Sequence, residues 1–152
     1  MTDNQMMNIP LAVVKLTETM CDQASRALGT DGQFFPAAFN FKRDHSLQAR
    51  IKEAKRIADK YPDRIPVICT KRPGCQIPDI DKHKFLVPMD LTVGQFMYVV
   101  RKRMHLSDTQ ATFFFVGETL PAASTLMKTV FEMHKDVDGF LYMVFSTEDT
   151  FG

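Results

Sequence analysis

Apolar residues recur at steps of three and four along several stretches of this 152-residue chain. This is the spacing of one face of an α-helix. The stripes predict helices over residues 9–28, 47–60 and 93–104, and a shorter helix that carries apolar residues within 126–131. Polar and charged residues fill the positions between the stripes, so each of these helices is expected to pack one face and expose the other.

Residues that typically begin or end helices stand beside these stripes. Gly29 is placed to end the first helix, and Tyr61, with Pro62 and Asp63 behind it, is placed to end the second. Thr92 and Gln95 have the three-residue spacing of a capping box at the start of the third. Ser124 is expected to cap the fourth.

Short runs of β-branched and aromatic residues predict four strands. Residues 65–69 and 84–87 are joined by a connection that contains Pro and Gly, and they are interpreted as a hairpin. Residues 112–116 and 140–145 predict two later strands. The order is strand, strand, helix, strand, helix, strand. It favours an α+β fold of the β-grasp type, the ubiquitin architecture, in which the first and last strands pair.

The first forty residues differ from the rest because they lack dense charge and end in turn-forming residues around 29–36. The chain is therefore divided into an N-terminal extension, 1–40, and a domain, 41–152. The predicted helix of the extension is interpreted as a flap on the domain or a partly disordered arm. Membrane insertion is less favoured, since the polar face carries only Lys15 and Arg26 as basic residues.

Composition places the chain among globular proteins, with 45% hydrophobic and 24% charged residues. The net charge of +1 conceals an uneven distribution. Residues 41–103 hold 15 Lys and Arg against 7 Asp and Glu, whereas residues 104–152 hold 2 against 7. The basic middle would attract anionic lipid, an acidic peptide or nucleic acid, and charge alone does not rank these three.

The cysteines and histidines offer little for catalysis. Three cysteines without a C-x-x-C pair, and no apolar signal segment, indicate a reducing compartment and therefore the cytosol. Cys69 with His45, His83, His105 or His134 could be imagined as a nucleophile and base, but Cys69 lies in an apolar strand with no catalytic signature around it. The widely spaced histidines make a poor metal site. We therefore expect no enzyme activity, no metal and no cofactor.

Several motifs resemble the GABARAP-type, autophagy-related protein eight family, in one order and without a gap from about Phe41 to the end of the chain. They are Tyr61-Pro62-Asp63-Arg64-Ile65-Pro66-Val67-Ile68, Asp81-Lys82-His83-Lys84-Phe85-Leu86-Val87-Pro88, Asp90-Leu91-Thr92-Val93-Gly94-Gln95-Phe96, Arg101-Lys102-Arg103, Phe113-Phe114-Phe115-Val116, Gly139-Phe140-Leu141-Tyr142 and Phe151-Gly152. So many motifs in one order are a far more specific signal than any single short pattern.

The resemblance implies a ubiquitin-like β-grasp with two additional N-terminal helices, here preceded by the helical extension. It also implies a modifier whose terminal Gly152 is joined to phosphatidylethanolamine through E1-like and E2-like enzymes, after exposure of that glycine by a cysteine protease. Glycine suits this role because it has no side chain to hinder a narrow enzyme cleft. The modifier would occupy the cytosol and, once lipidated, the autophagosome membrane. If the natural chain ends at Gly152, no maturation cleavage is needed.

The resemblance further implies capture of aromatic-x-x-aliphatic motifs from cargo receptors and adaptors, as a strand added along residues 82–87. The aromatic pocket would comprise Glu53, Ile57, Pro66, Ile68, Lys84, Leu86 and Phe140. The aliphatic pocket would comprise Phe85, Val87, Pro88, Leu91, Phe96 and Val99. Acidic residues flanking the motif would pair with Arg64, Lys82 and Arg103, and Phe113 and Phe115 would form the processing and conjugation surface. Taken singly, four of these residues are more typical of a core than of a pocket, so their role rests on the resemblance and on their being only partly covered: Ile57, Ile68, Leu86 and Phe96. The strand edge is expected to be unpaired.

Other readings stay open. A ubiquitin-like peptide-binding module that is not conjugated is the serious alternative, and a protein-conjugated modifier of the autophagy-related protein twelve type is another. Nucleic-acid binding is disfavoured because no recognised module or interleaving of basic and aromatic residues is present. Ser46-Leu47 departs from a Pro-Phe pair common in the family, which leaves the placement of the first helices open.

Overall fold

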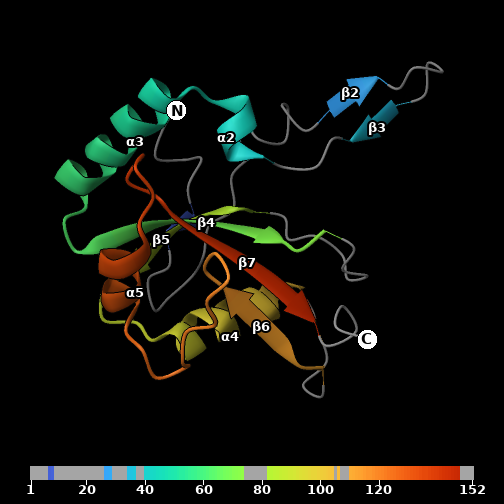
Figure 1. Ribbon diagram of the computed structural model, residues 1–152, viewed down its shortest axis with the longest axis vertical. Coiled ribbons are helices and arrows are strands. Elements are labelled where there is room, and N and C mark those ends of the chain that lie inside the picture. Colours follow the sequence, from blue (N-terminus) through green and yellow to red (C-terminus); the bar gives the residue numbers. More distant parts are fainter. Residues whose placement is uncertain are drawn as a thin grey trace.

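A five-stranded mixed sheet is the centre of the computed structural model (Figure 1). The structure describes residues 7–8, 26–28, 34–36, 40–73, 82–104, 106 and 110–147. Strand order across the sheet is β1-β5-β4-β7-β6. Its strands are β1 (Met7–Asn8), β4 (Arg64–Lys71), β5 (Lys84–Pro88), β6 (Thr112–Phe115) and β7 (Leu141–Thr147).

The strand pairing confirms the predicted β-grasp. β4 and β5 are antiparallel, and β6 and β7 are antiparallel. The first strand of the hairpin and the last strand of the chain, β4 and β7, run parallel at the centre, with Val67 opposite Leu141. Because a parallel pair needs a long crossover connection, the intervening helices are placed across the sheet.

Helices cover both faces of the sheet. α4 (Val93–Met104) and α5 (Met127–His134) contribute to the main core, together with alternate residues of the strands. α2 (Phe41–Asp44) and α3 (Leu47–Lys60) pack on the opposite face, where a second, smaller cluster forms. The alternation of the strands supplies both clusters, since successive side chains of a strand point to opposite faces.

Helix caps explain where most of these helices begin. The Gln95 N–H donates to Thr92 Oγ1 at 3.1 Å, and the Thr92 N–H donates to Gln95 Oε1 at 2.9 Å, which confirms the predicted capping box. Ser46 caps α3 by accepting from the Ala49 N–H at 3.1 Å. A serine in place of the family's proline is therefore a cap in this chain, and α3 spans the predicted residues.

Two predictions about elements were wrong. Ser124 does not begin the last helix: the N-cap is Leu126, which makes no side-chain capping bond. Backbone bonds to the loop before α4 and to its first residues hold this segment instead, among them Met127 N–H to the Leu91 carbonyl at 2.7 Å and Val93 N–H to the Thr125 carbonyl at 2.8 Å. The predicted helix over 9–28 is also wrong at its end, because β2 (Arg26–Leu28) pairs antiparallel with β3 (Phe34–Pro36). Residues 9–25 lie outside the described residues.

Within the described part of the chain, every helix is too short or too polar to cross a bilayer.

Candidate peptide-binding edge

The hydrogen bonds at the two ends of the β4–β5 pair show which groups β5 directs away from its partner. The Cys69 N–H donates to the His83 carbonyl at 2.8 Å, just before β5 begins. The Met89 N–H donates to the Asp63 carbonyl at 3.2 Å, just after β5 ends. Antiparallel residues alternate between hydrogen-bonded and non-hydrogen-bonded pairs. Odd-numbered residues of β5 therefore bond β4, and even-numbered ones face the other side.

The outer edge of β5 thus consists of the backbone groups of Lys84, Leu86 and Pro88, while Phe85 and Val87 bond β4. Lys84 and Leu86 each present an N–H and a carbonyl. Pro88 presents only a carbonyl, because proline has no N–H. The edge that sequence analysis predicted for peptide capture therefore offers two donors and three acceptors.

The two predicted pockets lie on opposite faces of β5. Leu86 belongs to the smaller cluster beneath α2 and α3. Its neighbours Phe85 and Val87 belong to the main core beneath α4 and α5. A strand laid along this edge would therefore send alternate side chains toward the aromatic set on one face and the aliphatic set on the other.

The structure brings the predicted aromatic-pocket residues together. Ile57 of α3, Ile68 of β4, Leu86 of β5 and Phe140 form one cluster. Buried Glu53 stands one helical turn before Ile57 and accepts from Arg56 at 2.7 Å. Pro66, which faces Leu86 across the hairpin, and Lys84 are also buried. The predicted set is contiguous.

The expectation that these pocket residues are only partly covered was wrong. The exposed fraction is 0% for Ile57, 1% for Ile68, 2% for Leu86 and 0% for Phe96. Phe41 of α2 contributes to this burial, because its ring packs against the Phe140 ring at a centroid distance of 5.0 Å. Sequence analysis missed Phe41, because a helix of one turn has no apolar stripe to reveal its packed face.

The aliphatic set divides between core and surface. Phe85, Val87 and Phe96 are fully buried, and the Phe85 and Phe96 rings meet edge to face at 5.3 Å. Leu91 and Val99 are partly buried and pack against this core. Pro88 is half-buried at the end of the strand. The accessible part of this set is therefore Pro88, Leu91 and Val99.

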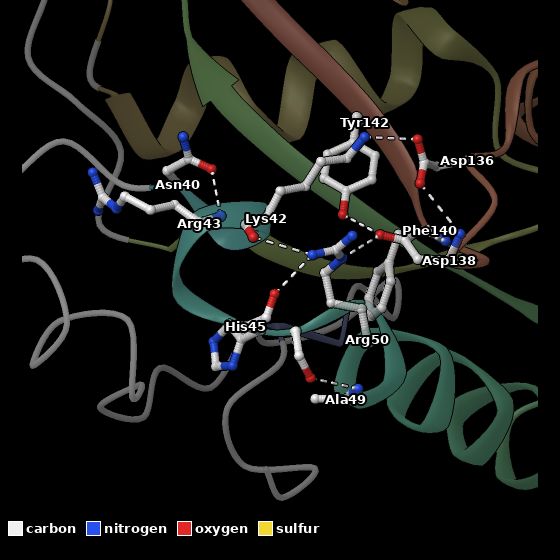
Figure 2. Close-up of polar contacts among 11 residues, drawn as sticks. Asn40, Lys42, Arg43, His45, Ala49, Arg50, Asp136, Asp138, Phe140 and Tyr142 are labelled. Carbon is white, nitrogen blue, oxygen red and sulfur yellow. Dashed lines mark hydrogen bonds and ion pairs between the residues drawn. The ribbon is translucent and has the colours of Figure 1, made fainter.

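α2 and α3, which together form a helical cover over the smaller cluster, are linked to the turn before the last strand by a buried ion pair, as Figure 2 shows. Arg50 of α3 lies 2.9 Å from the carboxylate of Asp138, and the side chains are 10% and 0% exposed. Arg50 also donates to the carbonyls of Lys42 and His45, at 3.1 Å and 2.7 Å. The Tyr142 hydroxyl donates to Asp138. One side chain of α3 thus connects α2 and α3 to the turn before β7, and Tyr142 of β7 bonds the same carboxylate.

The turn before β7 holds Asp138 in place. Gly139 has a φ of +92°, and a Cβ at this position would lie 2.8 Å from the Ala54 side chain of α3. Only glycine fits both the backbone angle and the approach. The Asp138 carboxylate accepts from the Phe140 N–H at 2.8 Å. Burial, and then the bond to Asp138, raises the pKa of the Tyr142 hydroxyl above its ordinary value.

His45 ends α2, and its backbone carbonyl belongs to this network. Its ring packs on Phe41 at 4.8 Å, and Nε2 is buried with no hydrogen-bond partner among the residues that the structure describes. The Lys84 ammonium lies 5.3 Å from the centre of the Phe41 ring on the same cluster. Burial, followed by the positive charge of Lys84, lowers the pKa of His45.

The basic residues predicted to flank a bound motif are not gathered in one place. Lys82 lies just before β5 and is 7% exposed, whereas Arg64 faces Pro88 at the far end of the same strand. Arg103 is half-buried in the last turn of α4. Lys82 and Arg64 thus mark the two ends of β5.

The predicted conjugation surface lies on the opposite edge of the sheet. Phe113 and Phe115 alternate with buried residues on β6, and both are half-buried. The guanidinium of Arg72 lies 5.1 Å from the centre of the Phe115 ring. Gly152 lies outside the described residues.

The prediction of an unpaired β5 edge was wrong. β1 runs parallel to β5 on the side away from β4, with Met7 opposite Phe85 and Asn8 opposite Leu86. The sequence does not predict this pairing, because a strand of two residues, Met7 and Asn8, is too short to show a periodic pattern.

Comparison with known proteins supports the β-grasp fold. Residues 49–152 match the family model described as "Autophagy protein Atg8 ubiquitin like". The chain is 59% identical over 112 residues to autophagy-related protein 8 of Mycosarcoma maydis, covering 74% of this chain and 95% of that protein. It is 57% identical over 116 residues to autophagy-related protein 8a of Arabidopsis thaliana, covering 76% and 95%.

A solved structure is similar as well. The crystal structure of Trypanosoma brucei ATG8 has a TM-score of 0.69 and 41% identity, and the match covers 72% of this chain and 94% of that one. The fold and the strand edge define a ubiquitin-like protein of the β-grasp class. The chain belongs to the Atg8 family of ubiquitin-like autophagy proteins.

Proposed function

We propose that this chain is a conjugated modifier that captures partner motifs along β5 and is anchored to phosphatidylethanolamine through Gly152. The observation that carries the capture function is the outer edge of β5, where the backbone of Lys84 and Leu86 is flanked by an apolar cluster on each face. An extended peptide adds to such an edge through main-chain bonds, and side-chain pockets give specificity.

The spacing of an aromatic-x-x-aliphatic motif fits this edge. Residues three apart in an extended strand point to opposite faces, because side chains alternate at every step. The aromatic anchor would enter the cluster of Ile57, Ile68 and Leu86, and the aliphatic anchor would meet Leu91 and Val99. A spacing of two or four would send both anchors to one face and leave the other cluster empty.

Entry to the aromatic side requires some cover to move. A hollow of about 430 Å³ lies between α2 and α3, beside the buried cluster, and includes Glu53 and Phe41 in its lining. Since α2 is a single turn, shifting it disturbs fewer backbone bonds than shifting α3 would. Movement of Phe41 would open the cluster to an incoming aromatic ring.

The expected affinity is modest. Each buried anchor contributes roughly 1.5 to 3 kcal/mol, and ordering of the peptide offsets part of that gain. Together with the strand hydrogen bonds, this suggests binding near the micromolar range. Lys82 and Arg64, at the two ends of β5, suit acidic residues before and after the motif.

Conjugation would make the domain a membrane protein without a spanning helix. The five residues beyond β7 reach about 16 Å when extended, enough to enter the active site of a conjugating enzyme. The acyl chains of the attached lipid contribute about 0.8 kcal/mol per buried CH₂. The partners would be E1-like and E2-like enzymes, a cysteine protease that removes the chain from lipid, and motif-bearing receptors and adaptors.

The conjugation half is tested with Gly152→Ala. Incubation of the full chain with E1-like and E2-like enzymes, ATP and phosphatidylethanolamine liposomes should give a mass gain of one lipid, which the variant abolishes. Glu118→Ala is the control, because it also changes a single residue but lies in an exposed turn of the domain. A mass gain in Gly152→Ala equal to that of wild type would contradict the proposal, and a gain on protein instead of lipid would favour a protein-conjugated modifier.

The capture half is tested with Leu86→Ala. Losing one buried anchor contact should weaken an acidic Trp-x-x-Leu peptide by about tenfold, or about 1.4 kcal/mol, in calorimetric titration of the full chain. Val130→Ala is the control, since it truncates a buried side chain of α5 far along the chain from β5. Equal peptide affinity in wild type and Leu86→Ala, with both variants folded by circular dichroism, would remove the pocket assignment.

A further inference from the structure

Two residues near the start of the chain, Met7 and Asn8, lie along the edge at which a partner motif is proposed to bind. β1 (Met7–Asn8) is parallel to β5, with Met7 opposite Phe85 and Asn8 opposite Leu86. β4 occupies one side of β5, so β1 occupies the other, where the backbone groups of Lys84 and Leu86 are directed. β1 and a partner strand would therefore need the same donors and acceptors.

We infer that the segment around Met7–Asn8 is a built-in ligand of the β5 edge, which competes with partner motifs and must leave before one of them binds. This inference rests on the proposed peptide capture and adds its regulation. The occupant is the chain itself, because the strand register assigns these two residues to this edge.

The sequence around β1 resembles the motif that the edge is proposed to bind. Met6 and Ile9 are apolar and three residues apart, the spacing of the two anchors in an aromatic-x-x-aliphatic motif. Pro10 follows and lacks the N–H that would prolong a ladder. A methionine in the aromatic position makes this a weaker version of the motif, which suits a ligand that has to be displaced.

The side chains along β5 are covered separately from its backbone edge. Lys84 is 1% exposed and Leu86 is 2% exposed. Leu86 lies in the cluster beneath α2 and α3, and the Lys84 ammonium lies 5.3 Å from the centre of the Phe41 ring, so part of this cover comes from the helices. A partner motif therefore has to displace β1 from the edge and also to move the helical cover.

Because β1 and β5 belong to one chain, their pairing is intramolecular. A free peptide competes against an effective concentration that is of millimolar order for a short connection and falls as the connection lengthens. A pairing of two residues supplies few hydrogen bonds, so closure is expected to be partial. The apparent dissociation constant of a motif then rises in inverse proportion to the fraction of chains whose edge is open.

The full chain is compared with Met7→Pro/Asn8→Pro and with Met7→Ala/Asn8→Ala. Because Met7 lies opposite Phe85 in a parallel pair, its backbone groups are directed at Lys84 and Leu86, whereas those of Asn8 point away from β5. The proline variant removes the Met7 N–H, and the alanine variant keeps it. Titration with the acidic Trp-x-x-Leu peptide should show about threefold or tighter binding to the proline variant. Binding to the alanine variant should lie closer to wild type. Threefold corresponds to an edge that is closed in about two thirds of wild-type chains.

Amide hydrogen exchange without peptide gives a second, independent readout. The amide of Leu86, which faces the Met7 carbonyl, should exchange faster in the proline variant, whereas those of Phe85 and Val87, which bond β4, should not change. Unchanged exchange of Leu86 would overturn the inference. Faster exchange with unchanged peptide affinity would overturn the competition. Absence of peptide binding in all three proteins would instead overturn the proposed capture function.

Discussion

His45 illustrates how one side chain can couple this fold to pH. Its ring is packed on Phe41, and the Lys84 ammonium lies near the same ring. Nε2 is buried without a hydrogen-bond partner among the described residues, so a proton added there would have no described acceptor. Burial and Lys84 lower its pKa, and Arg50 acts in the same direction, while Asp44 opposes them. The folded chain therefore keeps His45 neutral at pH values at which an unfolded chain protonates it.

The sign of the pH effect follows from this difference. Above pH 6.5, the ordinary pKa, His45 is neutral in both states and contributes no pH dependence. As the pH falls below 6.5, the unfolded chain binds a proton that the folded chain does not, so stability decreases until the lowered pKa is reached. Urea unfolding at pH 7.5 and 5.0 should show a smaller loss of stability in His45→Gln than in wild type. Equal losses in the two proteins would contradict this account.

At the scale of elements, the start of α4 depends on a reciprocal cap. Thr92 and Gln95 each accept from the other's N–H. Thr92→Ala should lower the free energy of unfolding by about 1 kcal/mol, as measured by chemical denaturation. Gln95→Ala should cost less, since a side chain that reaches back is more exposed. The double variant should lose less than the sum of the two, because the two bonds stabilise one another; strictly additive losses would argue against coupling.

Periodicity predicted the long elements well. The stripes over 47–60 and 93–104 coincide with α3 and α4, because each spans three turns or more and packs one face against the sheet. It failed where tertiary bonds decide the local structure. Ser124 looks like a cap, but backbone bonds to the loop before α4 hold its segment in a turn. At Arg26–Leu28 an apolar pattern that fits a helix is paired as a strand with Phe34–Pro36.

The candidate site was predictable in its membership but not in its accessibility. Ile57, Ile68, Leu86 and Phe140 do meet in one cluster. Their burial was not predicted, because it depends on Phe41 in a one-turn helix and on the folded arrangement of the whole chain. The pairing of Met7–Asn8 with β5 is likewise a long-range contact that no local pattern encodes.

For the molecule as a whole, Arg50 and Asp138 join the helical cover to the sheet. The pair is buried, and Asp138 also accepts from Tyr142 and from the Phe140 N–H. Removing one member of a buried ion pair leaves the other charge without its partner. The two layers on this face are therefore expected to respond together when either residue is changed.

Asp138→Ala should lower the free energy of unfolding by about 3 to 5 kcal/mol, because the Arg50 guanidinium would stay buried without its carboxylate. Lys42→Ala is the control, because it removes the more exposed partner of another ion pair on this face and leaves Asp136 bonded to the Asp138 N–H. The pair of Lys42 with Asp136, at 2.7 Å, should contribute less than about 1 kcal/mol. Urea denaturation of the three proteins measures both. Similar losses in the two variants would show that the buried pair is not what fastens the cover.

The short outer margin of β5 has a kinetic consequence. Along the described strand only Lys84 and Leu86 supply backbone donors at this margin, and the row of donors ends at Pro88, which has no N–H. Any strand seated on so few bonds dissociates quickly, and it cannot template the unlimited stacking by which longer bare edges polymerise. Lasting retention then has to come from several copies acting at once, so crowding of this domain on one surface would select partners that carry repeated motifs over those that carry a single one.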